Sequence, residues 1–230
     1  MNPLKTRMRR SSTAVALTWF GLLAAGHLPN AHAAVLIDNL AQPTRATTTV
    51  EANLWAAQSF VTAGAALGLD SVTLLLGAGA NSGSASAELR VDASGVPGAW
   101  LASLPLPVLV GGPPQAETLI PTLPTQLAPF TSYWLVLGAS TAGDSFGWSY
   151  AMGNAFNGPG AFGNYAYSSD AGLSWQGPNS DDLYQLRIEV SPVPEPTSAF
   201  LALAGCAGLA LRIRRRRQPM ARPDQSMPQS

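Results

Sequence analysis

Short apolar runs, separated by glycine, proline and other turn-forming residues, constrain the fold of this chain more than any other feature. Several runs alternate between apolar and polar side chains, as in Glu88–Asp92, where Leu89 and Val91 share one face. The segment Tyr184–Val190 alternates in the same way. This period of two is typical of half-buried antiparallel strands, and helix signals are nearly absent. We predict an all-β fold, an antiparallel β-sandwich with jelly-roll-like connections, over residues 34–191.

Other segments complete the expected sheets. Val72–Leu76 and Tyr133–Leu137 are continuous apolar runs, which suits central strands buried on both faces. We expect further strands at Val35–Leu40, Trp55–Val61, Glu117–Ile120 and Phe146–Tyr150. Between the strands we expect a turn at Asp92–Gly98, proline-rich connectors or sheet edges at Leu104–Pro114 and Pro121–Pro129, and a glycine-rich loop at Gly153–Gly163.

The beginning of the chain has the composition of a secretory signal peptide. Ala14–Ala25 is an apolar run, and it follows a positively charged segment that contains Lys5, Arg7, Arg9 and Arg10. Ala31 and Ala33 flank His32 in an A-x-A cleavage site. We therefore expect residues 1–33 to be a signal peptide that signal peptidase removes on the general secretory route.

An apolar run followed by clustered arginines indicates a single membrane anchor near the C-terminus. Thr197–Leu211 spans 15 uncharged residues, and it is followed by Arg212, Arg214, Arg215, Arg216 and Arg217. As a helix the run measures about 22 Å, against a hydrocarbon core of roughly 30 Å. The arginines favour a transmembrane helix whose basic end stays cytoplasmic, with the β domain outside the inner membrane. A buried core helix is the alternative, and we expect residues 218–230 to be a disordered tail.

The segment before the anchor resembles a known sorting signal. Val193, Pro194, Glu195 and Pro196 form a V-P-E-P sequence, in which both prolines favour extended backbone. This motif, the apolar run and the arginines, together residues 192–217, resemble the PEP-CTERM sorting domain, which is also labelled an ice-binding protein C-terminal domain. The resemblance implies recognition by an exosortase, removal of the helix, and a host that makes exopolysaccharide. The chain departs from that pattern by continuing well beyond the arginines.

The domain between the two signals lacks the side chains that most catalytic and metal sites require. No histidine, lysine or cysteine lies between Ala34 and Pro196. This absence excludes a Ser-His-Asp triad, a catalytic thiol, a disulfide and the usual zinc sites in that stretch. Its three arginines and twelve carboxylates give a net charge of −9, which disfavours nucleic acid and anionic lipid as partners. We predict a non-enzymatic domain that needs no cofactor.

Two functions that use oxygen atoms stay open. A glycosidase needs a pair of carboxylates, and nothing in the sequence singles out two of the twelve. Asp181 and Asp182, close to Asn179, are candidate calcium ligands. Adjacent acids and an asparagine are also common in solvated loops, so we assign no metal site.

The stretch from Ser168 to Trp175 fits the pattern S-x-D-x-G-x-[ST]-W. It resembles the Asp-box of sialidases, which implies a structural hairpin in which Asp170 ties the turn and Trp175 packs beneath it. A sialidase would need several copies and a cluster of arginines, whereas this chain has one copy. We therefore expect Asp170, Gly172 and Trp175 to stabilise a hairpin.

A second resemblance covers the domain from about Val35 to Val190. The residues that carry it occur in order: Trp55–Phe60, Leu69–Leu74, Val91-Asp92 with Gly95–Gly98, Leu127–Leu137 and Trp148. They resemble the choice-of-anchor family of bacterial surface domains, in particular the one named R. That family is defined by its alternative C-terminal anchors, and the resemblance implies no activity.

Aromatic side chains crowd the second half of the domain, and most of them suit its core. Tyr165 and Tyr167, beside the glycine-rich loop, are the pair we expect to be exposed and able to stack on sugars. The main hypothesis is an exported, non-catalytic cell-surface or matrix protein, associated with exopolysaccharide. The alternatives are a carbohydrate-binding module, a carboxylate-based glycosidase, and adhesion to ice or another solid surface. The last follows from the label of the anchor and would need a flat threonine-rich face, of which Thr47–Thr49 is the only candidate segment.

Overall fold

The computed structural model describes residues 33–78, 85–109, 112–139, 141, 143–193 and 205–209. In this part the strands are β1 (Ala34–Asp38), β2 (Thr44–Glu51), β3 (Trp55–Val61), β4 (Leu67–Ala78), β5 (Ala85–Asp92), β6 (Pro97–Pro105), β7 (Gln115–Leu119), β8 (Thr125–Leu127), β9 (Ser132–Ala139), β10 (Ser145–Ala151), β11 (Ala161–Ser168), β12 (Gln176–Asn179) and β13 (Leu186–Pro192). Ala31, the rest of the predicted leader before Ala33, Pro194–Pro196, the anchor arginines and the tail lie outside the described residues.

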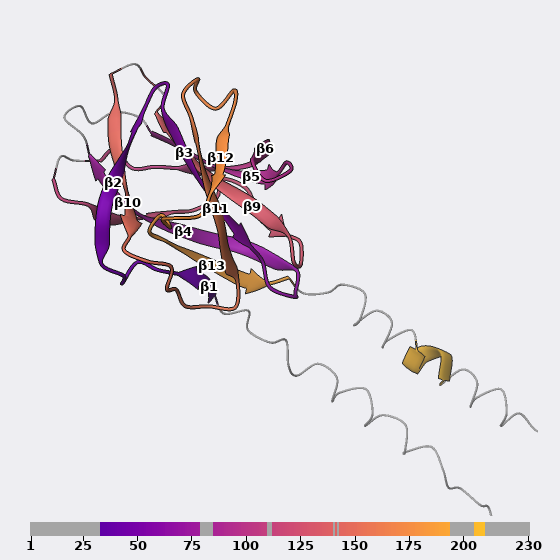
Figure 1. Ribbon diagram of the computed structural model, residues 1–230. Helices are drawn as coiled ribbons and strands as arrows, with labels where there is room; N and C mark the ends of the chain where they lie inside the picture. Colours follow the sequence, from indigo (N-terminus) through magenta and orange to yellow (C-terminus); the bar gives the residue numbers. More distant parts are fainter. Residues whose placement is uncertain are drawn as a thin grey trace, which may run out of the picture. The chain divides into compact units, whose positions relative to one another are not determined.

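The strands form two antiparallel sheets (Figure 1). Sheet A is 7-stranded, in the order β1-β13-β4-β10-β2, with β7 and β8 paired to the other edge of β4. Sheet B is 6-stranded, in the order β12-β11-β3-β9-β5-β6. The predicted all-β fold of two antiparallel sheets is therefore confirmed.

Side chains from both sheets fill one hydrophobic core. Leu74 and Ile188 from sheet A and Phe60, Leu89 and Leu135 from sheet B are all fully buried in the same cluster. Leu89 and Ile188 come from alternating segments, whereas Leu74 and Leu135 come from the two continuous apolar runs. Burial of this kind contributes roughly 1.5–3 kcal/mol for each large apolar side chain, so the alternation fixes which face of each sheet turns inward.

Strand β9 is buried on both faces, as its continuous apolar run predicts. Trp134 and Val136 belong to a second cluster, which Trp55 and Trp175 cover. The indole ring of Trp55 lies so close to Gly138 that any Cβ at that position would overlap it. The second cluster explains why this strand has no polar face.

Five strands are not predicted from the sequence: β2, β6, β8, β11 and β12, of which β8 lies in the expected connector or sheet edge Pro121–Pro129. Strand β2 is rich in threonine, with Val50 as its one buried side chain. Strand β6 is the edge strand of sheet B and has a proline at each end, where a missing N–H costs little. The predicted turn Asp92–Gly98 is shorter than expected, since β6 begins at Pro97, and the predicted loop Gly153–Gly163 gives way to β11 at Ala161.

Strand β4 is long enough to pair with two strands in succession along one edge. Leu67–Leu74 pairs with β13, and Leu76–Ala78 pairs with β10. Gln185 lies at the change of partner: its carbonyl accepts a hydrogen bond from Leu75 N at 3.2 Å, and its own N–H donates to Ser149 O at 2.8 Å. The segment that enters β13 is therefore hydrogen-bonded to β10.

Three buried amide side chains hold this entering segment in place. Asn39, Gln58 and Gln185 are at most 1% exposed. Gln58 Oε1 accepts from Tyr184 N at 3.0 Å, and Asn39 Oδ1 accepts from Leu186 N at 2.8 Å. Asn39 Nδ2 also donates to Tyr184 O at 3.1 Å. Because a buried backbone group without a partner is costly, these amides fix the path of residues 184–186.

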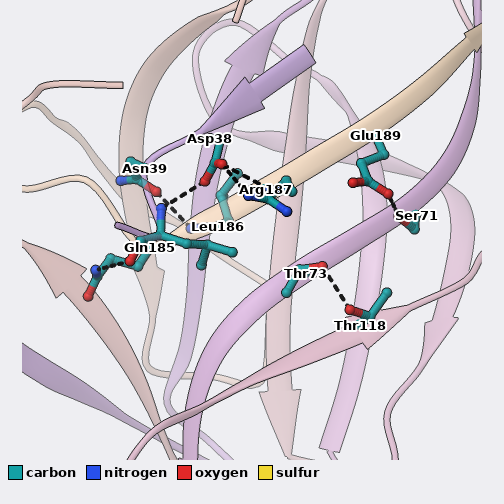
Figure 2. Close-up of polar contacts among 10 residues, drawn as sticks. Asp38, Asn39, Ser71, Thr73, Thr118, Gln185, Leu186, Arg187 and Glu189 are labelled. Carbon is teal, nitrogen blue, oxygen red and sulfur yellow. Dashed lines mark hydrogen bonds and ion pairs between the residues drawn. The ribbon is translucent and has the colours of Figure 1, made fainter. Parts of the chain in front are cut away.

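Polar pairs link β13 and β4 to their neighbours beside this segment. Figure 2 shows Asn39 bonded to Leu186, and three pairs along the strands: Asp38 with Arg187, Ser71 with Glu189, and Thr73 with Thr118. The ion pair between Arg187 Nη2 and Asp38 Oδ2 measures 2.6 Å and joins the first and last strands. These pairs support the register of sheet A.

Residues 205–209, inside the predicted anchor, are helical. Across the described residues, no helix combines the length and the apolar character that a membrane span requires. The other residues of the predicted anchor lie outside the described part of the chain.

Candidate functional site

A small pocket brings together side chains from both sheets. Its volume is about 150 Å³, and it is lined by Thr48, Tyr150, Tyr165, Asp182 and Tyr184. Thr48 comes from β2 and Tyr150 from β10 of sheet A, whereas Tyr165 comes from β11 of sheet B. Asp182 and Tyr184 lie in the connection from β12 to β13. We call this hollow the tyrosine pocket.

Tyr184 is the centre of an aromatic group that forms the walls of the pocket. Its ring stacks on Trp148, with centroids 4.3 Å apart and an interplanar angle of 19°. Tyr150 and Tyr165 meet it edge-on, at 6.3 Å and 89° and at 6.1 Å and 87°. Trp148 is fully buried and Tyr184 nearly so, so the core holds one wall rigidly while the other two rings stay partly exposed.

Hydrogen bonds and one ion pair place the polar groups of the pocket. Tyr184 Oη donates to Thr48 Oγ1 at 3.0 Å. Arg45 Nη1 contacts Asp182 Oδ1 at 2.8 Å, with side-chain exposures of 57% and 25%. An ion pair this exposed stabilises by about 0–1 kcal/mol at most. No hydrogen bond to Asp182 Oδ2 is found among the described residues, so that oxygen is available to a ligand.

Two tyrosines of the pocket, Tyr165 and Tyr184, have hydroxyls whose pKa is raised by their surroundings. Burial is the main cause that raises the pKa of Tyr184 to about 12. The pKa of Tyr165 is raised as well, first by burial and then by the negative charges of Asp181 and Asp182. The pocket therefore combines neutral phenols, which donate hydrogen bonds, with a negative electrostatic potential.

The structure separates the two tyrosines predicted to bind sugar. Tyr165 lines the tyrosine pocket. Tyr167, two residues along β11, is 39% exposed and is not among the lining residues. Thr48, Tyr150 and Tyr184 were not predicted as sugar-binding residues, and Thr48 was considered only for adhesion to ice. Tyr150 and Tyr184 occupy apolar positions of alternating segments. This pattern predicts burial in the core and does not indicate a binding site.

The calcium candidates receive no support as a metal site. Asp182 is paired with Arg45, and calcium needs about six to eight oxygen ligands. Within the described ranges, no group of three or more histidine, cysteine, aspartate or glutamate side chains lies close enough to hold a metal ion. Asp182 instead contributes its carboxylate to the tyrosine pocket.

The predicted Asp-box hairpin is confirmed as a structural element. Asp170 Oδ1 accepts from Ser174 N at 2.9 Å and from Ser168 Oγ at 2.7 Å, and Asp170 Oδ2 accepts from Ser174 Oγ at 2.6 Å. These bonds lower the pKa of Asp170 to about 2, chiefly through the Ser174 hydroxyl. Gly172 has φ +80° and lies against Trp55, and Trp175 packs on the second cluster.

Two further hollows lie on the surface of the described residues. One of about 490 Å³ contains Asp70, whose Oδ1 accepts from Ser191 Oγ at 2.9 Å. Another of about 230 Å³ contains Thr47 and Thr49. Thr47 and Thr49 are exposed on β2, while Thr48 is half-buried at the tyrosine pocket. Each of these three hollows is lined by at most one carboxylate side chain.

Comparison with known proteins adds no family assignment. No protein-family model matches the chain, and a search of curated proteins finds no significant match. The resemblances to the sorting domain and to the choice-of-anchor domain therefore stay predictions from the sequence. Among the described residues, we take the tyrosine pocket as the candidate site, because aromatic rings, hydroxyls and a carboxylate from both sheets meet there.

Proposed function

We propose that this protein is an exported, non-catalytic cell-surface or matrix protein that binds exopolysaccharide through its tyrosine pocket. In this proposal signal peptidase removes residues 1–33, and the helix followed by Arg212 and Arg214–Arg217 holds the jelly-roll-like domain at the inner membrane. An exosortase then recognises Val193–Pro196, removes the helix and passes the domain to the envelope or the extracellular matrix.

One observation carries the binding part of the proposal: the pocket combines aromatic walls with polar groups in a volume that suits one sugar ring. The apolar face of a pyranose packs against aromatic rings, and its hydroxyls bond to phenols and carboxylates. Tyr165 offers a partly exposed ring, Thr48 and Tyr184 offer hydroxyls, and Asp182 offers an acceptor. A pocket of about 150 Å³ matches a cavity known to hold a benzene-sized ring.

The absence of a paired carboxylate in the described hollows favours binding over hydrolysis. A retaining glycosidase places its two carboxyl groups about 5–5.5 Å apart, and an inverting enzyme about 6.5–9.5 Å apart. Asp182 is the only carboxylate among the residues that line the tyrosine pocket, and its ion-pair partner is Arg45. This arrangement supports a protein that holds glycan without cleaving it.

Affinity electrophoresis tests the binding proposal. The full chain, kept soluble in detergent, is run through gels that contain exopolysaccharide from the host. We expect retardation that Tyr165→Ala abolishes, since this substitution removes one wall of the pocket. Tyr167→Ala is the matched control on the same strand, and it should leave the retardation unchanged. Migration unaffected by every host glycan would overturn the proposal, and retardation that survives Tyr165→Ala would move the site elsewhere.

Cell fractionation tests the sorting proposal independently. We expect the wild-type chain without its C-terminal helix in the envelope or the medium. Replacing Pro194 and Pro196 by alanine should leave the uncut chain in the inner membrane, because the extended motif is lost. An intact polypeptide in the cytosol, with leader and tail both present, would contradict export altogether.

A further inference from the structure

We propose that the tyrosine pocket recognises its ligand through a positively charged ammonium group. The proposal rests on the proposed binding function and deepens it by naming the ligand class. Two sources share this chemistry: the free amino group of a hexosamine unit in a glycan, and a small quaternary ammonium compound such as choline.

The arrangement of the rings is the first argument. Tyr150 and Tyr165 both stand nearly perpendicular to Tyr184, at 89° and 87°. These three rings line the hollow together, and we refer to this arrangement as the box. A cation within about 6 Å of such a ring centroid is attracted electrostatically by the ring quadrupole. A box of rings beside a carboxylate suits the compact cationic group of a ligand.

The charges around the pocket are the second argument. Asp182 lines the pocket, and the negative potential of Asp181 and Asp182 reaches Tyr165. An anionic sugar such as a uronate would be repelled by these two carboxylates, and an ammonium group would be attracted. The cation already in contact with Asp182 is Arg45, which the chain supplies itself.

In this proposal, Arg45 competes with a ligand cation for the carboxylate of Asp182. Its Nη1 lies 2.8 Å from Asp182 Oδ1, yet 57% of its side chain is exposed. A pair this exposed is weak and easily exchanged. The ammonium group of a ligand inside the box is less exposed to water than this guanidinium, so it can displace Arg45 from the carboxylate.

The volume of the pocket limits the size of the group. About 150 Å³ holds one ring or one trimethylammonium headgroup. The pocket therefore has room for a single charged unit, and the rest of a glycan chain would lie outside it.

Isothermal titration calorimetry of the full chain in detergent at pH 6.5 tests this inference. The probes are D-glucosamine, N-acetyl-D-glucosamine, D-glucuronate and choline. We expect glucosamine, choline or both to bind at least tenfold more tightly than the other two. Binding of glucosamine alone identifies a glycan amino group as the source, and binding of choline alone identifies a free quaternary ammonium.

Two variants of the ion pair distinguish a ligand site from a structural contact. Asp182→Asn should weaken the bound ammonium probe about tenfold, because it removes the counter-charge. Arg45→Gln should strengthen binding severalfold, because it removes the competing cation. A merely structural ion pair predicts that both variants change affinity in the same direction. Thermal melting of both variants shows whether they keep the fold.

The ammonium site and the glycan-binding function are contradicted by different results. Equal binding of glucosamine and N-acetylglucosamine, or failure of all four probes to bind, overturns the ammonium site. Exopolysaccharide retardation that depends on Tyr165 stands in either case. Conversely, choline binding without retardation by any glycan keeps the ammonium site and removes the glycan function.

Discussion

The indole ring of Trp148 stacks on the phenol ring of Tyr184, with their centroids 4.3 Å apart and their planes inclined by 19°. Trp148 comes from β10, and Tyr184 lies just before β13. The indole N–H also donates to the carbonyl of Gln185 at 3.2 Å. One fully buried side chain thus positions both the ring and the backbone of the segment that builds the tyrosine pocket.

Alkaline pH should destabilise the folded protein through Tyr184. Its pKa is about 12 in the folded state, against an ordinary value of 10.0. The stability linked to the protonated hydroxyl is therefore fully present below pH 10 and is lost as the pH rises toward 12. We expect a loss of roughly 2–3 kcal/mol over this range, measured by urea unfolding. Tyr184→Phe should show a shallower pH dependence, and equal slopes for the two proteins would refute the assignment.

Gln58→Leu should lower the free energy of unfolding, although leucine is similar in size to glutamine. The amide oxygen of Gln58 accepts from Tyr184 N at 3.0 Å in a fully buried position. Leaving this N–H without a partner costs about 1–3 kcal/mol in the free energy of unfolding. Gln126→Leu, at an exposed position, is the control and should change stability by less than about 0.5 kcal/mol. Similar losses for the two variants would show that the buried bond contributes little.

Gly138→Ala should disturb the outer surface of sheet B. The added methyl group would overlap the indole ring of Trp55, which lies across this glycine. Overpacking of this kind costs about 1–3 kcal/mol. Gly77→Ala is a matched control in another strand, because its methyl group would meet Pro114 Cγ at an ordinary 3.6 Å. Comparison of the two urea midpoints measures the effect, and an unchanged midpoint for Gly138→Ala would show that Trp55 moves freely.

Asp170→Asn should loosen the hairpin that carries Trp175. The carboxylate accepts hydrogen bonds from Ser168 and Ser174, and its pKa is lowered to about 2. Its contribution to stability is present above the ordinary pKa of 3.8 and is lost as the pH falls toward 2. We expect a melting temperature lower by a few degrees at neutral pH, with a smaller difference between variant and wild type in acid. A constant difference across this range would exclude the carboxylate as the cause.

Alternation of apolar residues predicted most of the fold, since it reports directly on which face of a strand is buried. Strand β3 runs from Trp55 to Val61 as predicted, and the run Tyr133–Leu137 lies inside β9. Strand β2 was not predicted because threonine stands both at its inward position Thr48 and at its outward positions, so the segment shows little apolar alternation. Its place in the sheet comes from pairing with β10, and such long-range pairing leaves no local pattern.

The site was harder to predict than the fold for the same reason. Tyr165 was found because it stands near glycine-rich sequence and polar residues. Tyr184 reads as a core residue, and it is one, with its ring buried and its hydroxyl at the pocket. Asp182 was considered in the sequence only as a candidate calcium ligand, not as part of a sugar site. Thr48 and Asp182 come from distant parts of the sequence, so only the folded chain shows that they share a hollow.

The pairing of β1 with β13 sets the order in which the chain can complete its structure. Within the described residues, the first strand and the last are hydrogen-bonded neighbours, and β13 lies between β1 and β4. A ribosome or a translocation pore delivers the polypeptide from its N-terminus, so β1 has no partner at that edge until residue 192 emerges. Vectorial delivery thus leaves the edges of β1 and β4 that face β13 open to other chains until β13 emerges. We expect maturation of this domain to depend on holding chaperones until its final strand arrives.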